Sequence, residues 1–109
     1  MNGRSYLLAV LVLAAAPQAR AQDEGIPVTS DVVRAKCGSC HRSDDKMRMS
    51  RISYRRATPE NWERTIKRMV VLNGVALEPV DARAVVRYLA DHQGLSPEEA
   101  KAADFEVER

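Results

Sequence analysis

The sequence has few large side chains for a chain of 109 residues. Aromatic residues make up 5% of it, as one Trp, three Tyr and one Phe. This length allows one domain, and a domain of this size with so few large side chains builds only a thin hydrophobic core. We therefore expect something other than the chain's own side chains to complete the core.

Long apolar runs are missing too, except at the start of the chain. Residues 1–21 combine a basic residue, Arg4, an apolar segment over residues 6–16 and an A-x-A cleavage site at residues 19–21. This is the pattern of a secretory signal peptide, and its apolar segment is too short to span a bilayer. We expect cleavage after Ala21, export to the periplasm and a mature chain without a membrane span.

Neither sign of charge dominates the mature sequence, because loss of the signal peptide lowers the basic residues from 17 to 15, against 15 acidic ones. Between residues 34 and 56, however, eight basic residues stand against two acidic ones. This segment is either a docking face for an acidic partner or a solvated face. Nucleic acid is not an expected partner of an exported protein. The arginines of most interest are Arg48, Arg51, Arg55 and Arg56.

The two cysteines of the chain lie in one short motif. Cys37-Gly38-Ser39-Cys40-His41 has the form C-x-x-C-H, the attachment signature of c-type haem. On one helical turn, Cys37 and Cys40 can each form a thioether with a haem vinyl group, and His41 can then bind the iron as the proximal ligand. The motif predicts one covalent haem c, which would also complete the thin core.

Other interpretations of the two cysteines explain less. Export favours oxidised cysteines, so the pair could form a structural disulfide or a thioredoxin-like redox couple. No β-α-β pattern surrounds the motif, however, and neither alternative accounts for His41. A zinc site would need a fourth ligand, and the chain has no second cysteine pair. Haem attachment is the preferred interpretation, with thiol–disulfide oxidoreduction kept as an alternative.

The pattern before residue 58 predicts a leader, a short helix and a loop. We interpret residues 22–28 as a leader and residues 29–109 as one domain. Thr29 or Ser30 can cap a helix that leads to Cys37. Residues 42–57 are polar and basic, and we expect them to pass the haem edge as a loop.

Two longer helices are expected next. Thr58 and Pro59 suit the cap and first position of a helix that ends at residues 73–74. A further helix opens at Pro79 or Asp81 and is closed by Gly94. The sequence S-P-E-E at residues 96–99 is a capping box for a short final turn. The apolar positions expected to face inward are Trp62, Ile66, Met69 and Val70 in the first of these helices, and Ala82, Val85, Val86 and Leu89 in the second. No strand pattern appears, so the prediction is all-α.

This order of elements resembles that of compact bacterial class I cytochromes c, including Tyr-Leu-Ala at residues 88–90 in the last long helix. The resemblance implies a compact all-α domain wrapped around one covalent haem. It also favours Met69 as the distal ligand, since such cytochromes place a methionine ahead of the terminal helix. Met47 and Met49 in the basic loop, His92, and an open position filled by water remain alternatives.

Longer segments resemble a narrower family. Residues 51–62 (RISYRRATPENW), Arg68-Met69 and residues 86–99 (VRYLADHQGLSPEE) are similar to the N-terminal haem-binding part of the α subunit of quinohaemoprotein amine dehydrogenase. The resemblance covers nearly all of the mature chain. It implies periplasmic relay of electrons from a dehydrogenase subunit holding a cysteine tryptophylquinone to a small cytochrome or copper protein.

The chain departs from that family in having one C-x-x-C-H motif where the α subunit has two. We interpret it as a free-standing single-haem relative or a truncated product. The quinone belongs to another chain, so we do not expect this one to oxidise an amine by itself. Nor does the sequence contain a general acid–base pair, a Ser-His-Asp order or a phosphate-binding glycine loop.

The leading hypothesis is a periplasmic mono-haem electron carrier or haem subunit. In it, Cys37 and Cys40 hold the haem, and His41 and Met69 bind the iron. The alternative of another class is a haem-based sensor or weak peroxidase with an open distal site.

Overall fold

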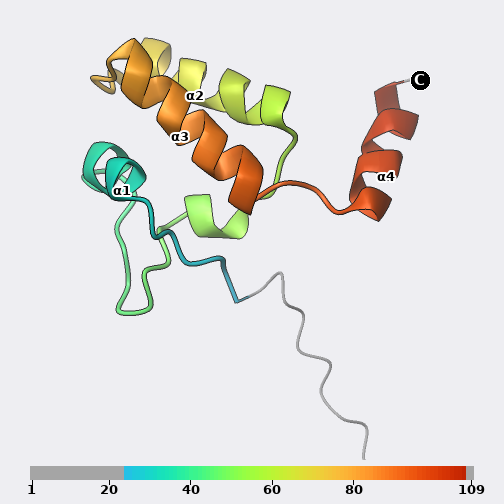
Figure 1. Ribbon diagram of the computed structural model, residues 1–109, viewed down its shortest axis with the longest axis horizontal. Coiled ribbons are helices and arrows are strands. Elements are labelled where there is room, and N and C mark those ends of the chain that lie inside the picture. The colour runs from blue at the N-terminus through green and yellow to red at the C-terminus, as the bar shows by residue number, and fades with distance from the viewer. Residues whose placement is uncertain (1–23, 108–109) are drawn as a thin grey trace, which may run out of the picture.

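The computed structural model describes residues 24–107, and the predicted signal peptide lies outside them. The described part contains four α-helices, one 3-10 helix and no strand, so the all-α prediction is confirmed for it (Figure 1). No helix in this range is long and apolar enough to cross a membrane. The elements are α1 (Asp31–Cys37), η2 (Ile52–Tyr54), α2 (Pro59–Asn73), α3 (Pro79–His92) and α4 (Pro97–Val107).

The first two α-helices begin and end where the sequence predicts. Ser30 caps α1, its hydroxyl accepting a hydrogen bond from the Val33 N–H at 3.3 Å. Thr58 caps α2 in the same way, accepting from the Asn61 N–H at 3.2 Å. Gly74 ends α2 in the left-handed conformation, with φ of 68°, which glycine adopts without a steric penalty. Local side-chain chemistry therefore fixes these boundaries.

The end of α3 differs from the prediction. We expected Gly94 to close this helix, but it ends at His92, and Gln93 is the cap residue with φ of −131°. The Gln93 N–H still donates to the Leu89 carbonyl at 2.8 Å. Gln93 leaves the helical conformation because its carbonyl and side chain have partners elsewhere in the core.

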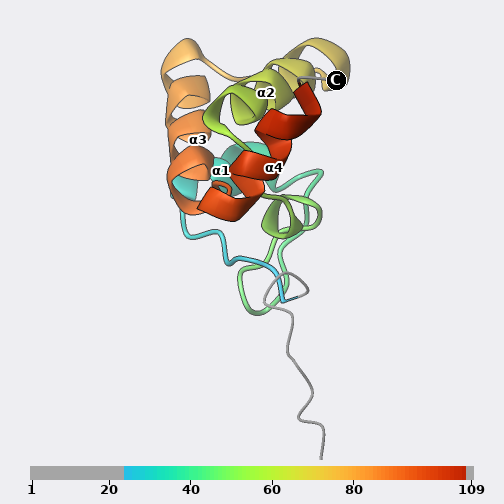
Figure 2. The same ribbon diagram turned by 90° about the vertical axis from the view of Figure 1, so that its right-hand side faces the viewer.

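The last helix is longer than the predicted short turn, since α4 extends over 11 residues. Its capping box is present as predicted. The Ser96 N–H donates to the Glu99 carboxylate at 2.8 Å, and the Glu99 N–H donates to the Ser96 hydroxyl at 3.2 Å. In Figures 1 and 2, α4 lies on the opposite side of the domain from α1.

Helices α2 and α3 form a hairpin, and α1 packs against α3 in the opposite direction. The start of α1 lies near the second half of α3, where the Thr29 N–H donates to the Tyr88 hydroxyl at 2.9 Å. The end of α1 lies at the start of α3, where the Lys36 ammonium is 3.7 Å from the Asp81 carboxylate. The haem motif at the end of α1 therefore lies at the connected end of the α2–α3 hairpin (Figure 1).

The core draws on the loop as well as on the helices, which corrects the prediction for residues 42–57. Ile52 and Ala57 are buried there, and Met49 is completely buried. An antiparallel bridge between Ser43 and Met49, followed by η2, folds the loop back so that its few apolar side chains point inward. The core residues are Val28, Val33, Met49, Ile52, Ala57, Trp62, Ile66, Val85 and Leu89.

One buried polar residue joins the loop to the hairpin. The side-chain amide of Gln93, 1% exposed, donates to the carbonyls of Ile52 at 2.6 Å and Arg55 at 2.8 Å. The Gln93 carbonyl accepts from the Trp62 indole N–H and from the Ala57 N–H, both at 3.0 Å. Buried polar groups stabilise a fold when they are paired, and Gln93 pairs four groups of other residues, although among the described residues its own Oε1 is buried without a partner.

Replacement of Gln93 by Ala is expected to lower the free energy of unfolding by about 2–4 kcal/mol, because the Arg55 carbonyl loses its donor from Gln93, the Ile52 carbonyl is left with the Arg55 N–H alone, and a cavity opens. Urea denaturation of the haem-loaded protein measures the change. The variant Gln93→Met keeps most of the volume and isolates the hydrogen-bond contribution. The exposed Glu63→Ala is the control, expected within about 0.5 kcal/mol of the parent protein. A loss below about 1 kcal/mol in Gln93→Ala would contradict the assignment.

Candidate functional site

The two cysteines of the C-x-x-C-H motif lie one turn apart at the end of α1. Cys37 is the last residue of α1 and packs partly against the core, whereas Cys40 is exposed. Both thiols are free. The Cys40 and His41 N–H groups both donate to the Cys37 carbonyl, at 3.4 and 2.9 Å, so the chain continues turning through the motif. Two free thiols on one turn, followed by a histidine, match the requirements of thioether attachment.

Gly38 is required by the chain's own backbone. Its N–H donates to the Arg34 carbonyl at 3.1 Å, and a β-carbon at this position would collide with the same carbonyl oxygen. The first of the two positions between the cysteines is therefore restricted to glycine by the chain's own backbone, whether or not a ligand is bound.

The imidazole of His41 is held in a defined orientation. Its Nδ1 lies 2.9 Å from the Ser50 carbonyl oxygen. A carbonyl oxygen can only accept, so Nδ1 carries the proton and the neutral ring leaves the lone pair of Nε2 available. Metal-binding histidines are commonly held in this way, with the second ring nitrogen donating to a backbone carbonyl. The geometry at His41 therefore fits an axial ligand to iron.

The acidity of Cys37 argues against a dithiol catalyst. Burial raises the pKa of the Cys37 thiol, and the neighbouring Cys40 raises it further. Thiol–disulfide oxidoreductases depend on a cysteine with a lowered pKa, because the thiolate is the nucleophile. The environment of Cys37 therefore suits a residue that packs against the core better than one that attacks a disulfide.

Two of the alternative distal ligands are poorly placed. Met49 is completely buried by the chain's own side chains, so its sulfur presents no face to a haem. His92 is exposed in the last turn of α3 and packs against Tyr88, with 4.3 Å between the ring centroids. Since Tyr88 contacts Thr29 at the start of α1, His92 lies toward the end of α3 that is remote from Cys37.

Met47 and Met69 lie on different elements of the fold. Met47 is on the loop that also carries Ser50, the partner of the His41 ring, and its sulfur accepts from the Arg34 guanidinium at 3.4 Å. Met69 lies on α2, in its last turns, and is half-buried. A distal ligand must not share the side of the haem that His41 would bind, so Met69, on an element other than the loop that holds the His41 ring, suits that role better.

Exposed apolar side chains gather near Met69. Val71 is 77% exposed, Leu72 72% and Val80 64%, and Val70 is also exposed. They lie in the last turns of α2 and the first turn of α3, the end of the hairpin near the haem motif. A ligand or partner that covers this end of the hairpin would remove these side chains from water. Val70 was predicted to be a core residue, and this prediction is wrong, because its side chain is exposed.

Most of the arginines singled out in the basic loop serve the fold. Arg48 pairs with Asp44, at 2.7 Å between Nε and Oδ2, and Arg55 lies 5.3 Å from the centroid of the indole ring in α2. Arg56 pairs with a glutamate of α4. Arg51 is exposed and has a positive φ of 66°, which is unusual for a residue other than glycine. Of these four arginines, Arg51 is the one most available to a partner.

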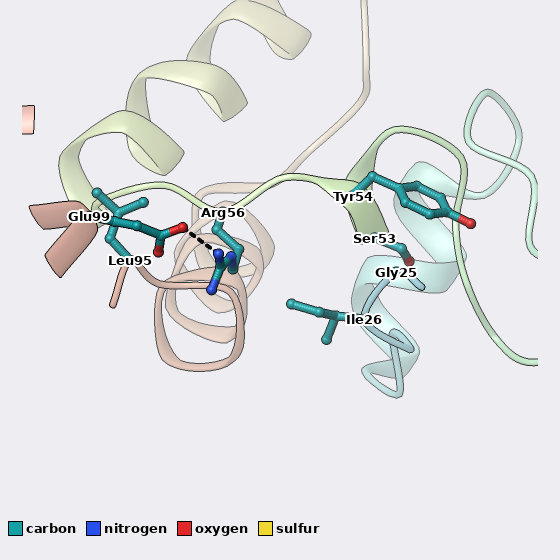
Figure 3. A pocket seen from close by; sticks show the side chains of 7 residues that line it. All are labelled: Gly25, Ile26, Ser53, Tyr54, Arg56, Leu95 and Glu99. Carbon is teal, nitrogen blue, oxygen red and sulfur yellow. Dashed lines mark hydrogen bonds and ion pairs between the residues drawn. The ribbon is translucent and has the colours of Figure 1, made fainter. Parts of the chain in front are cut away.

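A separate cavity lies on the α4 side of the domain (Figure 3). Its volume is about 350 Å³, and none of the haem-motif residues lines it. It opens between the segment before α1, η2 and the start of α4. The residues lining it are Gly25, Ile26, Ser53, Tyr54, Arg56, Leu95 and Glu99. This cavity is therefore distinct from the predicted haem site.

The comparison with protein families agrees with this geometry. The family described as quinohemoprotein amine dehydrogenase A, alpha subunit, haem binding, matches residues 28–109. The chain belongs to this family. The domain is thus a haem-binding domain of an amine dehydrogenase subunit, and the predicted family, fold class and haem cofactor are confirmed. A search of curated proteins found no match.

The ion pair at the cavity predicts a response to acid. The hydrogen bond from the Ser96 N–H is the main cause that holds the pKa of the Glu99 carboxyl below its usual range, and the positive charge of Arg56 lowers this pKa further. A carboxyl group whose pKa is lower in the folded state than in the unfolded chain stabilises the fold when the pH is above its ordinary pKa. This stabilisation is lost as the pH falls through the pKa of the folded state. Hydrogen exchange in α4 is therefore expected to quicken relative to α3 on acidification below about pH 4.

The matched variants for this prediction are Glu99→Gln and its exposed neighbour Glu98→Gln. Glu99→Gln should abolish the acid-dependent step in α4, whereas Glu98→Gln should retain it. Identical exchange profiles for α4 and α3 across this pH range would contradict the prediction.

Proposed function

We propose that this domain carries one covalent haem c and transfers single electrons between proteins. In this proposal, the thiols of Cys37 and Cys40 form the two thioethers, and His41 and Met69 are the axial ligands. The observation that supports it most strongly is the hydrogen bond from His41 Nδ1 to the Ser50 carbonyl, found next to two free thiols on one turn. When bound, the haem supplies a one-electron Fe(III)/Fe(II) couple.

The chain's own residues fix the proximal side. The Ser50 carbonyl accepts from His41 Nδ1, which fixes the ring orientation with Nε2 as the nitrogen available to a metal and makes the ring a stronger donor. Cys37 is anchored against the core, so the haem edge attached there would be held close to α1. Both features would restrain the protein side of the haem when it changes oxidation state.

The distal side favours electron transfer over ligand sensing. The Lys36–Asp81 contact brings the end of α1 to the start of α3, and the hairpin brings the last turns of α2 to the same end. Met69 lies there, on a different element from the loop that holds His41. A methionine that stays bound to the iron would leave no open position for a gas or a peroxide, which separates this proposal from the sensor or weak peroxidase.

We further propose that the domain works in the periplasm, as part of an electron relay. The signal-peptide pattern of residues 1–21 and the reliance of c-type haem attachment on export support this compartment. The family's name supports a quinone-bearing amine dehydrogenase subunit as the donor. A small cytochrome or copper protein is the proposed acceptor. Amine oxidation itself is assigned to the donor, because the resemblance to the family implies that the quinone belongs to that other chain.

The distal ligand is tested by Met69→Ala, with Met47→Ala as the matched control, in protein exported from a host that attaches haem c. The parent protein is expected to show a sharp reduced α band and, when oxidised, the weak methionine-to-iron charge-transfer band. Met69→Ala should lose the weak band and bind carbon monoxide rapidly in the ferrous form, whereas Met47→Ala should behave like the parent.

Three results would contradict this proposal in different ways. Rapid carbon monoxide binding by the parent protein would indicate a sensor or peroxidase. A charge-transfer band that survives in Met69→Ala would exclude Met69 as the ligand. A colourless product with two titratable thiols would indicate the dithiol oxidoreductase.

The proximal ligand is tested by His41→Ala, with His92→Ala as the control. Loss of the His41 imidazole should abolish a stable low-spin haem, because the remaining side chains at the motif offer no comparable iron ligand. His92→Ala should keep the low-spin spectrum, since His92 lies at the remote end of α3. A low-spin spectrum unchanged in His41→Ala refutes the assignment.

A further inference from the structure

We infer that Asn73 is a positioning residue that orients the Met69 sulfur and raises the reduction potential of the haem. This inference rests on the proposed function, because it requires Met69 to bind the iron. It starts from a contact on the surface of α2: the Asn73 side-chain amide donates to the Met69 sulfur, with 3.6 Å between Nδ2 and Sδ.

The end of α2 holds residue 69 at two points. Asn73 lies four residues after Met69, so both side chains share one face of the helix. The Met69 carbonyl accepts from the cap N–H of Gly74 and from the Val75 N–H, the latter at 3.3 Å. The left-handed conformation of Gly74 makes these two bonds possible. The segment Asn73-Gly74-Val75 therefore holds both the backbone and the side chain of Met69.

The contact restricts the direction from which iron can be bound. A thioether sulfur has two lone pairs and is a weak acceptor. With one lone pair directed at the Asn73 N–H, the other remains for the metal, and rotation of the long methionine side chain is limited. An unbranched side chain with several rotatable bonds otherwise adopts many positions. Asn73 thus selects one of these side-chain positions before Met69 binds the iron.

The same contact affects the electronic balance of the iron. A donated N–H draws electron density from the sulfur and makes it a weaker donor. Fe(III) depends more on ligand donation than Fe(II), so the hydrogen bond stabilises the reduced state and raises the potential. No proton moves in this effect, and the contribution is expected to be that of one modest hydrogen bond.

The test is the midpoint potential of Asn73→Leu, measured by spectroelectrochemical titration of the haem-loaded full chain. At a fixed applied potential, the Fe(III)/Fe(II) ratio is expected to rise by about threefold to tenfold, where tenfold corresponds to about 59 mV for one electron. The charge-transfer band should persist but shift or weaken. Asn73→Gln keeps a donor and should retain more of the parent potential than Asn73→Leu does.

Asn61→Leu is the matched control, because Asn61 is the other asparagine of α2 and is bonded to Arg64 instead of to a sulfur. Its potential should equal that of the parent protein. An unchanged potential in Asn73→Leu, with the charge-transfer band intact, would overturn the inference and leave the proposed function standing. A second result would also overturn the inference. If both Asn73→Leu and Asn73→Gln lose the charge-transfer band and have a lowered melting temperature, Asn73 has a general structural role instead. A band that survives in Met69→Ala overturns the ligand assignment and the inference with it.

Discussion

The hydrogen bond between His41 Nδ1 and the Ser50 carbonyl is the contact on which the candidate site depends. It determines which ring nitrogen is available to bind iron, and it requires the loop to return to the motif, with 2.9 Å between Nδ1 and the Ser50 carbonyl oxygen. The loop does so because Met49, the residue before Ser50, is completely buried and its N–H donates to the Ser53 hydroxyl at 2.7 Å. The orientation of the proposed iron ligand is thereby tied to the packing of the core.

The loop is in turn held from its far end by Gln93. The side-chain amide of Gln93 donates to the carbonyls of Ile52 in η2 and of Arg55 just after η2. The backbone carbonyl of Gln93 accepts from the Trp62 indole in α2 and from the Ala57 N–H just before that helix. A thin core gains rigidity from such a hub, because hydrogen bonds are directional whereas apolar packing is not. The orientation of His41, the proposed proximal ligand, therefore depends on a chain of contacts that runs from the end of α3 through η2 to the motif.

The sequence was informative where structure follows from neighbouring residues. Ser30, Thr58 and Gly74 define helix ends through contacts within a few positions, so α1 and the bounds of α2 were predictable, as was the C-x-x-C-H turn. The end of α3 was predicted wrongly, because the carbonyl of Gln93 is bound by Trp62 and Ala57, partners more than 30 residues away.

Two features of the site were missed for a similar reason. Met49 stands among basic residues, and the composition of that segment hides a core position. The Ser50 carbonyl is a backbone group, which every residue possesses, so the residue type at this position does not predict the contact with His41. Asn73 could have been noticed as the residue four positions after a candidate ligand, a spacing that places both side chains on one helix face.

The two sides of the proposed haem pocket differ in how firmly they are held. On the proximal side, Cys37 packs on the core and His41 is held by a loop with a buried residue. On the distal side, Met69 lies at a helix end among exposed apolar side chains, held by Asn73 and the cap of α2. Contacts at a solvated helix end can change without disturbing the core, whereas a change at Ser50 or Met49 would disturb both. Substitutions at the proposed distal side are therefore expected to change the potential while leaving the core intact, whereas substitutions at the proposed proximal side are expected to destabilise the fold as well.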